Sequence, residues 1–274
     1  MAGNETVGLC QTAKLSIKKG GTKVTRFKRV LLKVSGEALQ GEKPINEQGK
    51  IADLDPRMAA KMARKIKAVH DLGVQVAVVM GGGNLCRGKD WSKDGMDRVT
   101  ADYVGMLGTI MNGLVLMDAL ERLQSPVRLM SALSMPVAAE LYVRNKALRH
   151  LAHNRILILT AGTGVPYVTT DTGASLRALE LRCEVLIKAT KESGVYDRNP
   201  HEHSDARRFK TLNYRDAINM SGVEIIDTSA LAMCQESNLP SMVFKMFDEQ
   251  NLLAAIQGED VGTYLDNRTE TAYA

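Results

Sequence analysis

The chain has 274 residues, 45% of them hydrophobic and 24% charged, a length that suits one large α/β domain or two small ones. The formal net charge of the whole chain is +5. The first 30 residues hold seven Lys or Arg and one Glu, so this segment alone carries +6. The rest, with 29 basic and 30 acidic residues, carries −1. This near-neutral body excludes a basic nucleic-acid-binding face, and no nucleic-acid partner is expected.

The segment before this body is rich in Lys, Gly, Thr and Ser, so residues 1–25 are expected to form a basic disordered tail. A targeting peptide is the alternative, although the tail holds more lysine than arginine. We identify no apolar run of transmembrane length and expect no membrane partner. The cysteines are scattered, at Cys10, Cys86, Cys183 and Cys234. Without a Cys-x-x-Cys spacing, they favour reduced thiols and a cytoplasmic location.

A buried strand followed by three glycines is the most informative stretch. Branched apolar residues at 74–80 predict a strand covered on both faces. Gly81, Gly82 and Gly83 then let backbone N–H groups approach an anion, and Arg87 adds a cation suited to phosphate. The stretch predicts a phosphate-binding loop, with a plain tight turn as the alternative. Its spacing matches neither the Walker pattern nor the dinucleotide-binding pattern.

A lysine, Lys33, stands near the end of the first predicted strand, residues 29–34. Burying an ammonium group without a partner is costly. Because a Ser35-Gly36 turn follows, at the strand end where open α/β sheets bind ligands, we favour a functional Lys33 over one that snorkels at a sheet edge.

Asp55 and Pro56 predict a helix start, and residues 91–98 indicate a polar connection. Residues 100–123 predict a long helix that is apolar on nearly all sides. We interpret it as a subunit contact, with a deep core position as the alternative. Asp102 lies in its first turn, where it either binds a ribose or simply complements the helix dipole.

The remaining pattern alternates strands at residues 127–131, 155–160, 185–190 and 241–244 with helices at residues 138–153, 171–181, 214–220 and 228–237. This alternation predicts a parallel sheet with helices on both faces and right-handed crossovers. Residues after Gly258 are expected to fray. We therefore expect a basic tail (1–25), a single catalytic domain (26–264) and a C-terminal tail (265–274).

A second glycine-bearing loop, residues 161–171, follows the strand at residues 155–160. It offers glycines for close backbone approach and threonine hydroxyls, at Gly162, Gly164, Thr163, Thr169 and Thr170. Asp171 ends the loop, either as a functional carboxylate or as a helix cap. Because parallel strands bring such loops to one edge of a sheet, the two loops together predict a binding site. Residues 201–203 (His-Glu-His) lack a third ligand at useful spacing, which disfavours a metal site there.

This set of one strand-end lysine, two glycine loops, an arginine and two aspartates suits phosphoryl transfer, which needs anion positioning and charge neutralisation, usually with Mg²⁺. Five stretches resemble the bacterial uridylate (UMP) kinases, a branch of the amino acid kinase superfamily: residues 33–41, 81–88, 111–114, 161–171 and 188–191. The resemblance runs from about residue 29 to about residue 263.

The resemblance implies an α/β fold, a three-layer αβα sandwich with a mostly parallel central sheet, assembled as a homo-oligomer, a hexamer. It implies transfer of the γ-phosphoryl of ATP to UMP, which gives UDP and ADP in pyrimidine nucleotide biosynthesis. Mg²⁺ would be carried mainly by the nucleotide phosphates, with no protein ligand. GTP activation and UTP inhibition are implied as well, with effector contacts at residues 41–46.

The resemblance also assigns residues. The catalytic residues would be Lys33, Arg87 and Asp171. ATP would contact Lys33, Val34, Ser35, Gly36, Gly83, Arg87, Thr190, Tyr196 and Asn199. UMP would contact Gly82, Asp102, Thr163, Gly164, Val165, Pro166, Tyr167, Val168, Thr169 and Thr170, with Asp102 on the ribose. Asp171 would orient Lys33 and the metal.

The sequence departs from the family pattern at four positions. Val165 replaces an Asn near the uracil, Ser193 and Asn199 replace Asp residues on the adenosine side, and Lys245 replaces an Asn. Two alternatives remain: a superfamily kinase acting on a carboxylate or carbamate, and a non-catalytic nucleotide-binding or storage protein. The threonine-rich loop and Asp102 argue against the first; Lys33, Arg87 and Asp171 argue against the second.

Overall fold

The computed structural model describes residues 25–41, 53–86, 88–220, 226–246, 248 and 251–274. The predicted basic tail up to residue 24, most of the predicted effector loop, and Arg87 lie outside these residues.

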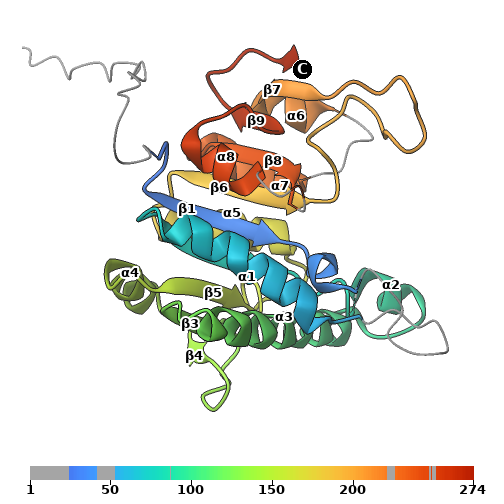
Figure 1. Cartoon of the computed structure of the whole chain (residues 1–274). Helices are drawn as coiled ribbons and strands as arrows, with labels where there is room; N and C mark the ends of the chain where they lie inside the picture. Colours follow the sequence, from blue (N-terminus) through green and yellow to red (C-terminus); the bar gives the residue numbers. More distant parts are fainter. Residues whose placement is uncertain (1–24, 42–52, 87, 221–225, 247, 249–250) are drawn as a thin grey trace, which may run out of the picture.

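The described residues form one sheet in the order β10-β7-β9-β8-β6-β1-β2-β5-β3-β4 (Figure 1). Its strands are β1 (Arg29–Val34), β2 (Gln75–Met80), β3 (Val127–Ser131), β4 (Glu140–Leu141), β5 (Ile156–Thr160), β6 (Val185–Thr190), β7 (Phe209–Asn213), β8 (Ser241–Lys245), β9 (Thr263–Asp266) and β10 (Ala272–Tyr273). Neighbouring strands are parallel except for the pairs β8–β9 and β10–β7.

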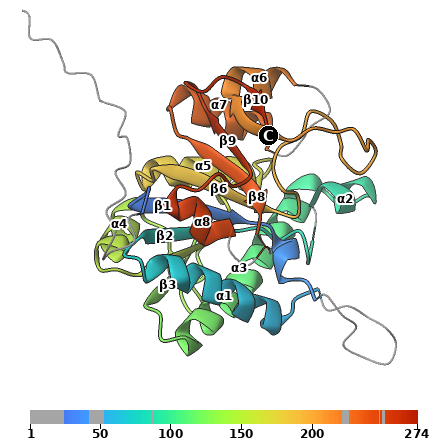
Figure 2. The same ribbon diagram turned by 45° about the horizontal axis from the view of Figure 1, so that its top comes forward.

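Helices cover both faces of the sheet, which confirms the predicted three-layer α/β sandwich (Figures 1 and 2). One core cluster packs α1 (Pro56–His70), α3 (Arg98–Arg122) and α8 (Asn251–Gln257) against the sheet. The other packs α4 (Arg144–Ala152), α5 (Thr170–Glu180), α6 (Tyr214–Asn219) and α7 (Thr228–Glu236). The short helices η1 (Gly36–Leu39) and α2 (Gly88–Lys93) follow the carboxyl ends of β1 and β2.

The alternation of side chains along β1 explains how the sheet serves both layers. Val30, Leu32 and Val34 belong to the core under α1 and α3, whereas Leu31 belongs to the core under α5. Because successive side chains point to opposite faces, Lys33 shares the face of Leu31. This alternation directs its ammonium group towards α5.

Helix α1 begins as predicted. Asp55 is its N-cap and accepts a hydrogen bond from the backbone N–H of Arg57, and Pro56 occupies the first helical position. Its apolar stripe of Met58, Met62, Ile66 and Val69 is buried. The helix therefore forms for the reasons that the sequence suggested.

Helix α3 lies directly on the sheet. At Gly113, an added Cβ would come within 2.8 Å of the Leu129 side chain, so the absent side chain permits this close approach. By length and composition α3 could cross a membrane, so our expectation of no such run is wrong on that measure. However, 50% of its most apolar window is buried inside the fold, and Asn112 is fully buried in a hydrogen-bonded pair. These features are those of a core helix.

Two predicted elements are wrong. Residues 138–153 do not form one helix, because residues 140–141 pair with β3 as strand β4 and α4 begins only at Arg144. The segment after Gly258 does not fray: β9 pairs with β8, and β10 pairs with β7. Asp266 stabilises the turn between β9 and β10 by accepting hydrogen bonds from the N–H groups of Arg268 and Thr269. Strand β7 and helix α8 were not predicted.

Candidate active site

Two lysines and one aspartate meet at the carboxyl ends of β1 and β6. Lys33 and Lys188 are register partners on these adjacent parallel strands. Lys33 Nζ lies 2.7 Å from Asp171 Oδ1, and Lys188 Nζ lies 2.5 Å from Asp171 Oδ2. All three side chains are largely buried, with 12–15% of each exposed. We refer to Lys33, Asp171 and Lys188 as the lysine–aspartate cluster.

The start of α5 explains why Asp171 is available for this cluster. Thr169 is the N-cap of the helix and accepts a hydrogen bond from the N–H of Thr172. The alternative interpretation of Asp171 as the cap is therefore wrong. Asp171 lies in the first turn, where the helix dipole stabilises a carboxylate. Thr169 and Thr172 also donate hydrogen bonds to Asp227, which is itself the N-cap of α7.

The charges of the cluster perturb one another. Burial on its own raises the pKa of Asp171, but the ammonium groups of Lys33 and Lys188 outweigh it and hold that pKa below its ordinary value of 3.8. Burial, followed by repulsion from Lys33, lowers the pKa of Lys188, and Asp171 opposes that shift. Asp171 is therefore an ionised carboxylate between two cations, and one positive charge remains uncompensated within the cluster when both lysines are protonated.

The first glycine loop lies beside the end of β1. The N–H of Gly81 donates to the carbonyl of Val34 over 2.8 Å. Asn112 on α3 donates to the carbonyl of Gly81 and pairs with Asn84. A Cβ on Gly82 would meet the carbonyl of Gly105 at 2.6 Å, so this position requires glycine for close packing on α3. The predicted partner of this loop, Arg87, lies outside the described residues.

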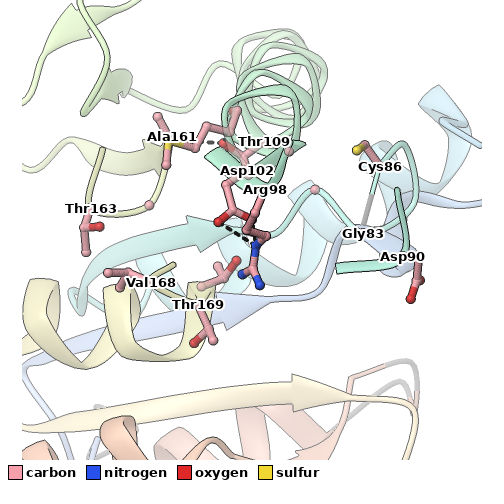
Figure 3. Close-up of a pocket in the computed structure, with 15 residues that line it drawn as sticks. Gly83, Cys86, Asp90, Arg98, Asp102, Thr109, Ala161, Thr163, Val168 and Thr169 are labelled. Atoms are coloured by element: carbon pink, nitrogen blue, oxygen red, sulfur yellow. Dashed lines mark hydrogen bonds and ion pairs between the residues drawn. The ribbon is translucent and has the colours of Figure 1, made fainter. Parts of the chain in front are cut away.

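A cavity of about 340 Å³ opens between the two glycine loops and α3 (Figure 3). Gly83, Cys86 and Asp90 lie on one side of it, and Thr163, Val168 and Thr169 lie on the other. It is lined by Gly82, Gly83, Cys86, Asp90, Arg98, Asp102, Gly105, Met106, Thr109, Ala161, Gly162, Thr163, Val168, Thr169 and Thr170. Because Asp171 follows Thr170 directly, the cavity adjoins the lysine–aspartate cluster.

Asp102 lines this cavity and already has hydrogen-bonding partners. Arg98 Nε lies 2.9 Å from both of its carboxylate oxygens, one helical turn away. The backbone N–H of Tyr167 donates to Asp102 Oδ2 over 2.8 Å. The Arg98 guanidinium lies 5.1 Å from the centre of the Tyr167 ring. These contacts tie the second glycine loop to α3, and they make Asp102 an acceptor directed into the cavity wall.

Hydrogen bonds from α3 and α5 fix the second glycine loop. The buried N–H of Ala161 donates to Thr109 Oγ1 on α3 over 2.6 Å. Arg177 Nη2 donates to the carbonyl of Gly162, while its Nη1 is paired with Glu180 at 2.7 Å. The Arg177 guanidinium also stacks 3.8 Å from the Tyr142 ring centre. The loop backbone is therefore fixed at Ala161 and Gly162 by hydrogen bonds within the protein.

The structure brings together many, but not all, of the predicted residues. Six of the predicted UMP residues line the cavity: Gly82, Asp102, Thr163, Val168, Thr169 and Thr170. Gly83 from the predicted ATP set lines it as well. The other four loop residues, Gly164, Val165, Pro166 and Tyr167, belong to the same loop but do not line it. Val165 and Tyr167 are exposed at its rim.

Apart from Arg87, the remaining predicted ATP residues lie at or after the carboxyl ends of β1 and β6. Val34, Ser35 and Gly36 continue from Lys33 into η1, where Glu37 forms an ion pair with Lys191 at 2.9 Å. Thr190 ends β6, and its Oγ1 accepts from the N–H of Glu192. Tyr196 forms an isolated antiparallel β-bridge with Arg208. The Asn199 side chain donates a hydrogen bond to the Glu202 carboxylate in the loop that follows. Val34 and Thr190 end the neighbouring strands β1 and β6, whereas Tyr196 and Asn199 belong to the segment between β6 and β7. None of these residues lines the cavity.

Sequence reasoning did not assign roles to several residues of the site. Lys188 carries the same signal that selected Lys33, a lysine inside an apolar strand, and that signal could have identified it. Arg98 could have been found as the i−4 ion-pair partner of Asp102. Cys86, Asp90 and Thr109 carry no comparable signal, because their proximity to the cavity depends on how α2 and α3 pack.

Among the described residues, no three His, Cys, Asp or Glu side chains converge as a metal site. His201, in the His-Glu-His stretch, instead lies 2.8 Å from Glu192.

The sandwich holds two lysines around an ionised carboxylate at adjacent strand ends, beside a cavity, and this arrangement suits phosphoryl transfer. The chain belongs to the amino acid kinase family, whose model matches residues 28–245. It is similar to the UMP kinase from Bacillus anthracis, with 33% identity and a TM-score of 0.83 over 90% of this chain and 99% of that chain.

Two further solved structures are similar over a comparable length. The UMP kinase from Ureaplasma parvum has 28% identity and a TM-score of 0.79, with 88% of this chain and 99% of that chain covered. The uridylate kinase from Archaeoglobus fulgidus has 26% identity and a TM-score of 0.63, with 86% and 99% covered.

Proposed function

We propose that this kinase is a cytoplasmic UMP kinase of pyrimidine nucleotide biosynthesis, which transfers the γ-phosphoryl of ATP to UMP and releases UDP and ADP. The observation that carries the proposal is the position of the lysine–aspartate cluster directly beside a cavity lined by Asp102 and several threonines. The similarity to two bacterial UMP kinases and one archaeal uridylate kinase supports it.

In the proposed reaction, a phosphate oxygen of UMP attacks the γ-phosphorus of ATP, and the bond from that phosphorus to the β,γ-bridging oxygen breaks. The attacking phosphate is already ionised at neutral pH, so no general base is needed. Lys33 and Lys188 place positive charge where the transferred group gathers negative charge. Asp171 acts as a positioning residue, since it fixes both ammonium groups through its two oxygens.

We assign the acceptor nucleotide to the cavity. The Thr163, Thr169 and Thr170 hydroxyls and the Gly82 backbone suit an anionic phosphate, and Asp102 suits the two ribose hydroxyls. In the structure, Asp102 is bonded to Arg98 and to the N–H of Tyr167. A ribose hydroxyl would therefore share or replace the Tyr167 contact. Gly164, Val165, Pro166, Tyr167 and Val168 would surround the base end of the nucleotide.

We assign ATP to the opposite side of the cluster, along the ends of β1 and β6. Ser35, Gly36 and Gly83 would face its phosphates, and Thr190, Tyr196 and Asn199 would contact its adenosine. Arg87 would add a cation at the phosphates, and its position stays a prediction. The Asn199 side chain is already bonded to Glu202, so its contact with adenosine requires a change of partner.

Mg²⁺ fits this arrangement as a companion of ATP. Asp171 is paired with two ammonium groups, and no group of three or more His, Cys, Asp or Glu side chains converges among the described residues. This donor set suits an ion held mainly by phosphate oxygens. When bound, Mg²⁺ would neutralise phosphate charge.

We further propose that copies of the chain associate through α3, up to a hexamer. Four exposed apolar side chains recur every four residues on this helix: Val99, Tyr103, Leu107 and Met111. This spacing gives one continuous stripe, and a helix presenting such a stripe suits self-association. Control by GTP and UTP stays a proposal, because residues 42–46 lie outside the described residues.

The decisive assay measures ADP release with ATP, Mg²⁺ and each nucleoside monophosphate, with acetylglutamate and aspartate as further acceptors. We expect rapid turnover of UMP and much poorer turnover of CMP. Equal use of CMP and UMP would overturn the pyrimidine assignment. Preference for a carboxylate would identify a different branch of the family, and ATP binding without turnover of any acceptor would indicate a non-catalytic protein.

A further inference from the structure

The last strand of the chain, β10, packs on the segment that leads out of the candidate ATP loop. Residue Tyr273 of β10 pairs with Phe209 at the start of β7. Their rings stack with centroids 4.7 Å apart and an interplanar angle of 19°. One residue further along, the N–H of Ala274 donates to the carbonyl of Arg208 over 2.9 Å. Figure 2 shows the chain end beside this loop.

The same backbone stretch is bonded on its opposite side to the residues that enter the loop. The N–H of Phe209 donates to the carbonyl of Val195 over 2.8 Å, and the N–H of Asp197 donates to the carbonyl of Arg207 over 3.1 Å. Residues 207–209 thus lie between residues 195–197 and residues 272–274. Strand β10 is therefore the outer of three antiparallel segments, and the two inner segments flank the loop at residues 198–206.

Side-chain contacts also join the same three segments. The Arg207 guanidinium lies 3.8 Å from the centre of the Tyr273 ring. Arg207 also contacts Asp197, through its backbone N–H at 3.0 Å and through Nε at 3.4 Å. Asp197 is adjacent to Tyr196, which the proposed function assigns to adenosine. The Tyr273 ring therefore holds Arg207 in the position from which it fixes Asp197.

We propose that β10 positions the loop that receives the adenosine of ATP, and that Tyr273 is the positioning residue. The assignment rests on the proposed function, since it takes residues 195–199 as part of the nucleotide site. The tyrosine ring is 42% exposed, and its ring contacts are to Phe209 and Arg207. Strand β10 is far from the acceptor side in the sheet order, because the two acceptor loops follow β2 and β5. Its loss should therefore affect ATP and leave UMP unaffected.

The first test measures loop order without any activity. In Tyr273→Ala, hydrogen exchange of the Asp197 and Phe209 amides should quicken, because the outer strand and the ring contact are lost. Amides of β1 and β2 should exchange as in the parent. Tyr273→Phe, which keeps the ring, should match the parent. Arg268→Ala changes an exposed side chain without a hydrogen bond or ion pair to the described residues, and it serves as a control in the same segment. Unchanged exchange in Tyr273→Ala would overturn the proposal.

The second test measures steady-state kinetics with ATP and UMP in the full chain. A stacked aromatic pair and an exposed cation–π contact each correspond to about a two- to tenfold change in an equilibrium. Tyr273→Ala should raise KM for ATP by about that factor, with KM for UMP and kcat near those of the parent. Equal increases in both KM values, or a fall in kcat alone, would show a general structural role and contradict the proposal.

A further variant covers the case in which Tyr273→Ala does not fold. Tyr273→Leu keeps apolar bulk but removes the aromatic face under Arg207, and it should show a smaller shift in the same direction. Direct binding of ATP without UMP separates failure of the proposed function from failure of the role of β10. If the parent binds ATP but phosphorylates no UMP, the proposed function fails. If the parent is an active UMP kinase and both variants bind ATP normally, the role of β10 fails.

Discussion

Lys33 and Lys188 are paired in register across β1 and β6, and their ammonium groups contact different oxygens of one carboxylate, that of Asp171. Two like charges at such close range are stable because the anion lies between them. The arrangement holds both cations at the strand ends before any phosphate arrives, which is the preorganisation that phosphoryl transfer requires.

Replacement of Lys188 should be as harmful as replacement of Lys33. We expect Lys188→Ala, Lys33→Ala and Asp171→Asn each to lower kcat for UMP phosphorylation by about two orders of magnitude, because each disrupts the charge that faces the transferred group. Circular dichroism should show an intact fold. Lys210→Ala removes an exposed lysine paired with Asp260 on the far side of the sheet and should leave kcat unchanged. Near-normal turnover in any of these three variants would show that the lysine–aspartate cluster is not the catalytic site.

The ionised state of Asp171 should contribute to stability in a pH-dependent manner. Its pKa in the folded chain lies below 3.8, so its contribution is complete above that value and is lost as the pH falls through the lower folded-state pKa. The difference in unfolding free energy between the parent and Asp171→Asn should therefore shrink as the pH drops below about 3.8. Urea titrations from neutral pH into this range measure it. A difference that stays constant would contradict an ionised Asp171.

Position 165 should influence the choice of base. Val165 is an exposed apolar residue on the second glycine loop, at a position where the resemblance to the bacterial UMP kinases implies asparagine. Val165→Asn adds a hydrogen-bonding group at the base end of the proposed acceptor, so the ratio of kcat/KM for UMP over CMP should rise about tenfold. Val165→Ala, which adds no polar group, is the matched control. An unchanged ratio in the asparagine variant would place residue 165 away from the base.

Thr109 should be needed for the stability of the second glycine loop. Its hydroxyl accepts from the buried N–H of Ala161, a residue with a positive φ of 60°. Thr109→Val leaves that N–H without its acceptor and should cost about 1–3 kcal/mol of unfolding free energy. Thr109→Ser retains the hydroxyl and should cost less. Equal losses in the two variants would assign the effect to packing of the methyl group instead.

The apolar stripe of α3 should control assembly. Leu107→Glu places a charge in the centre of that stripe and should shift the chain towards smaller species in light scattering after size exclusion. Lys210→Glu, on β7, changes charge away from the stripe and should not shift the mass. If the parent is already monomeric, or if Leu107→Glu has no effect, association through α3 is wrong.

Patterns within a few residues predicted much of the fold. The apolar runs of β1, β2, β5 and β6 are long enough to identify buried strands, and Asp55-Pro56 marked a helix start by local chemistry. Short elements escaped: β4 and β10 have two residues each, and no periodicity exists over that length. They form because a neighbouring strand offers hydrogen-bonding partners, which is a tertiary effect.

The site was predictable where a residue is unusual for its own element. A lysine in an apolar strand identified Lys33, and glycines after strands identified both loops. The partners were less accessible, because the contact between Thr109 and Ala161 spans 52 positions and depends on how α3 crosses the sheet. The same holds for Arg177, whose hold on Gly162 follows from the placement of α5.

The two ends of the sheet are formed by its shortest strands, β4 and β10. A short outer strand offers few unpaired backbone groups to another molecule, so such ends hinder edge-to-edge polymerisation. If β10 were detached, the five-residue strand Phe209–Asn213 would become the boundary. Preparations lacking the final segment should therefore be prone to forming insoluble aggregates when concentrated.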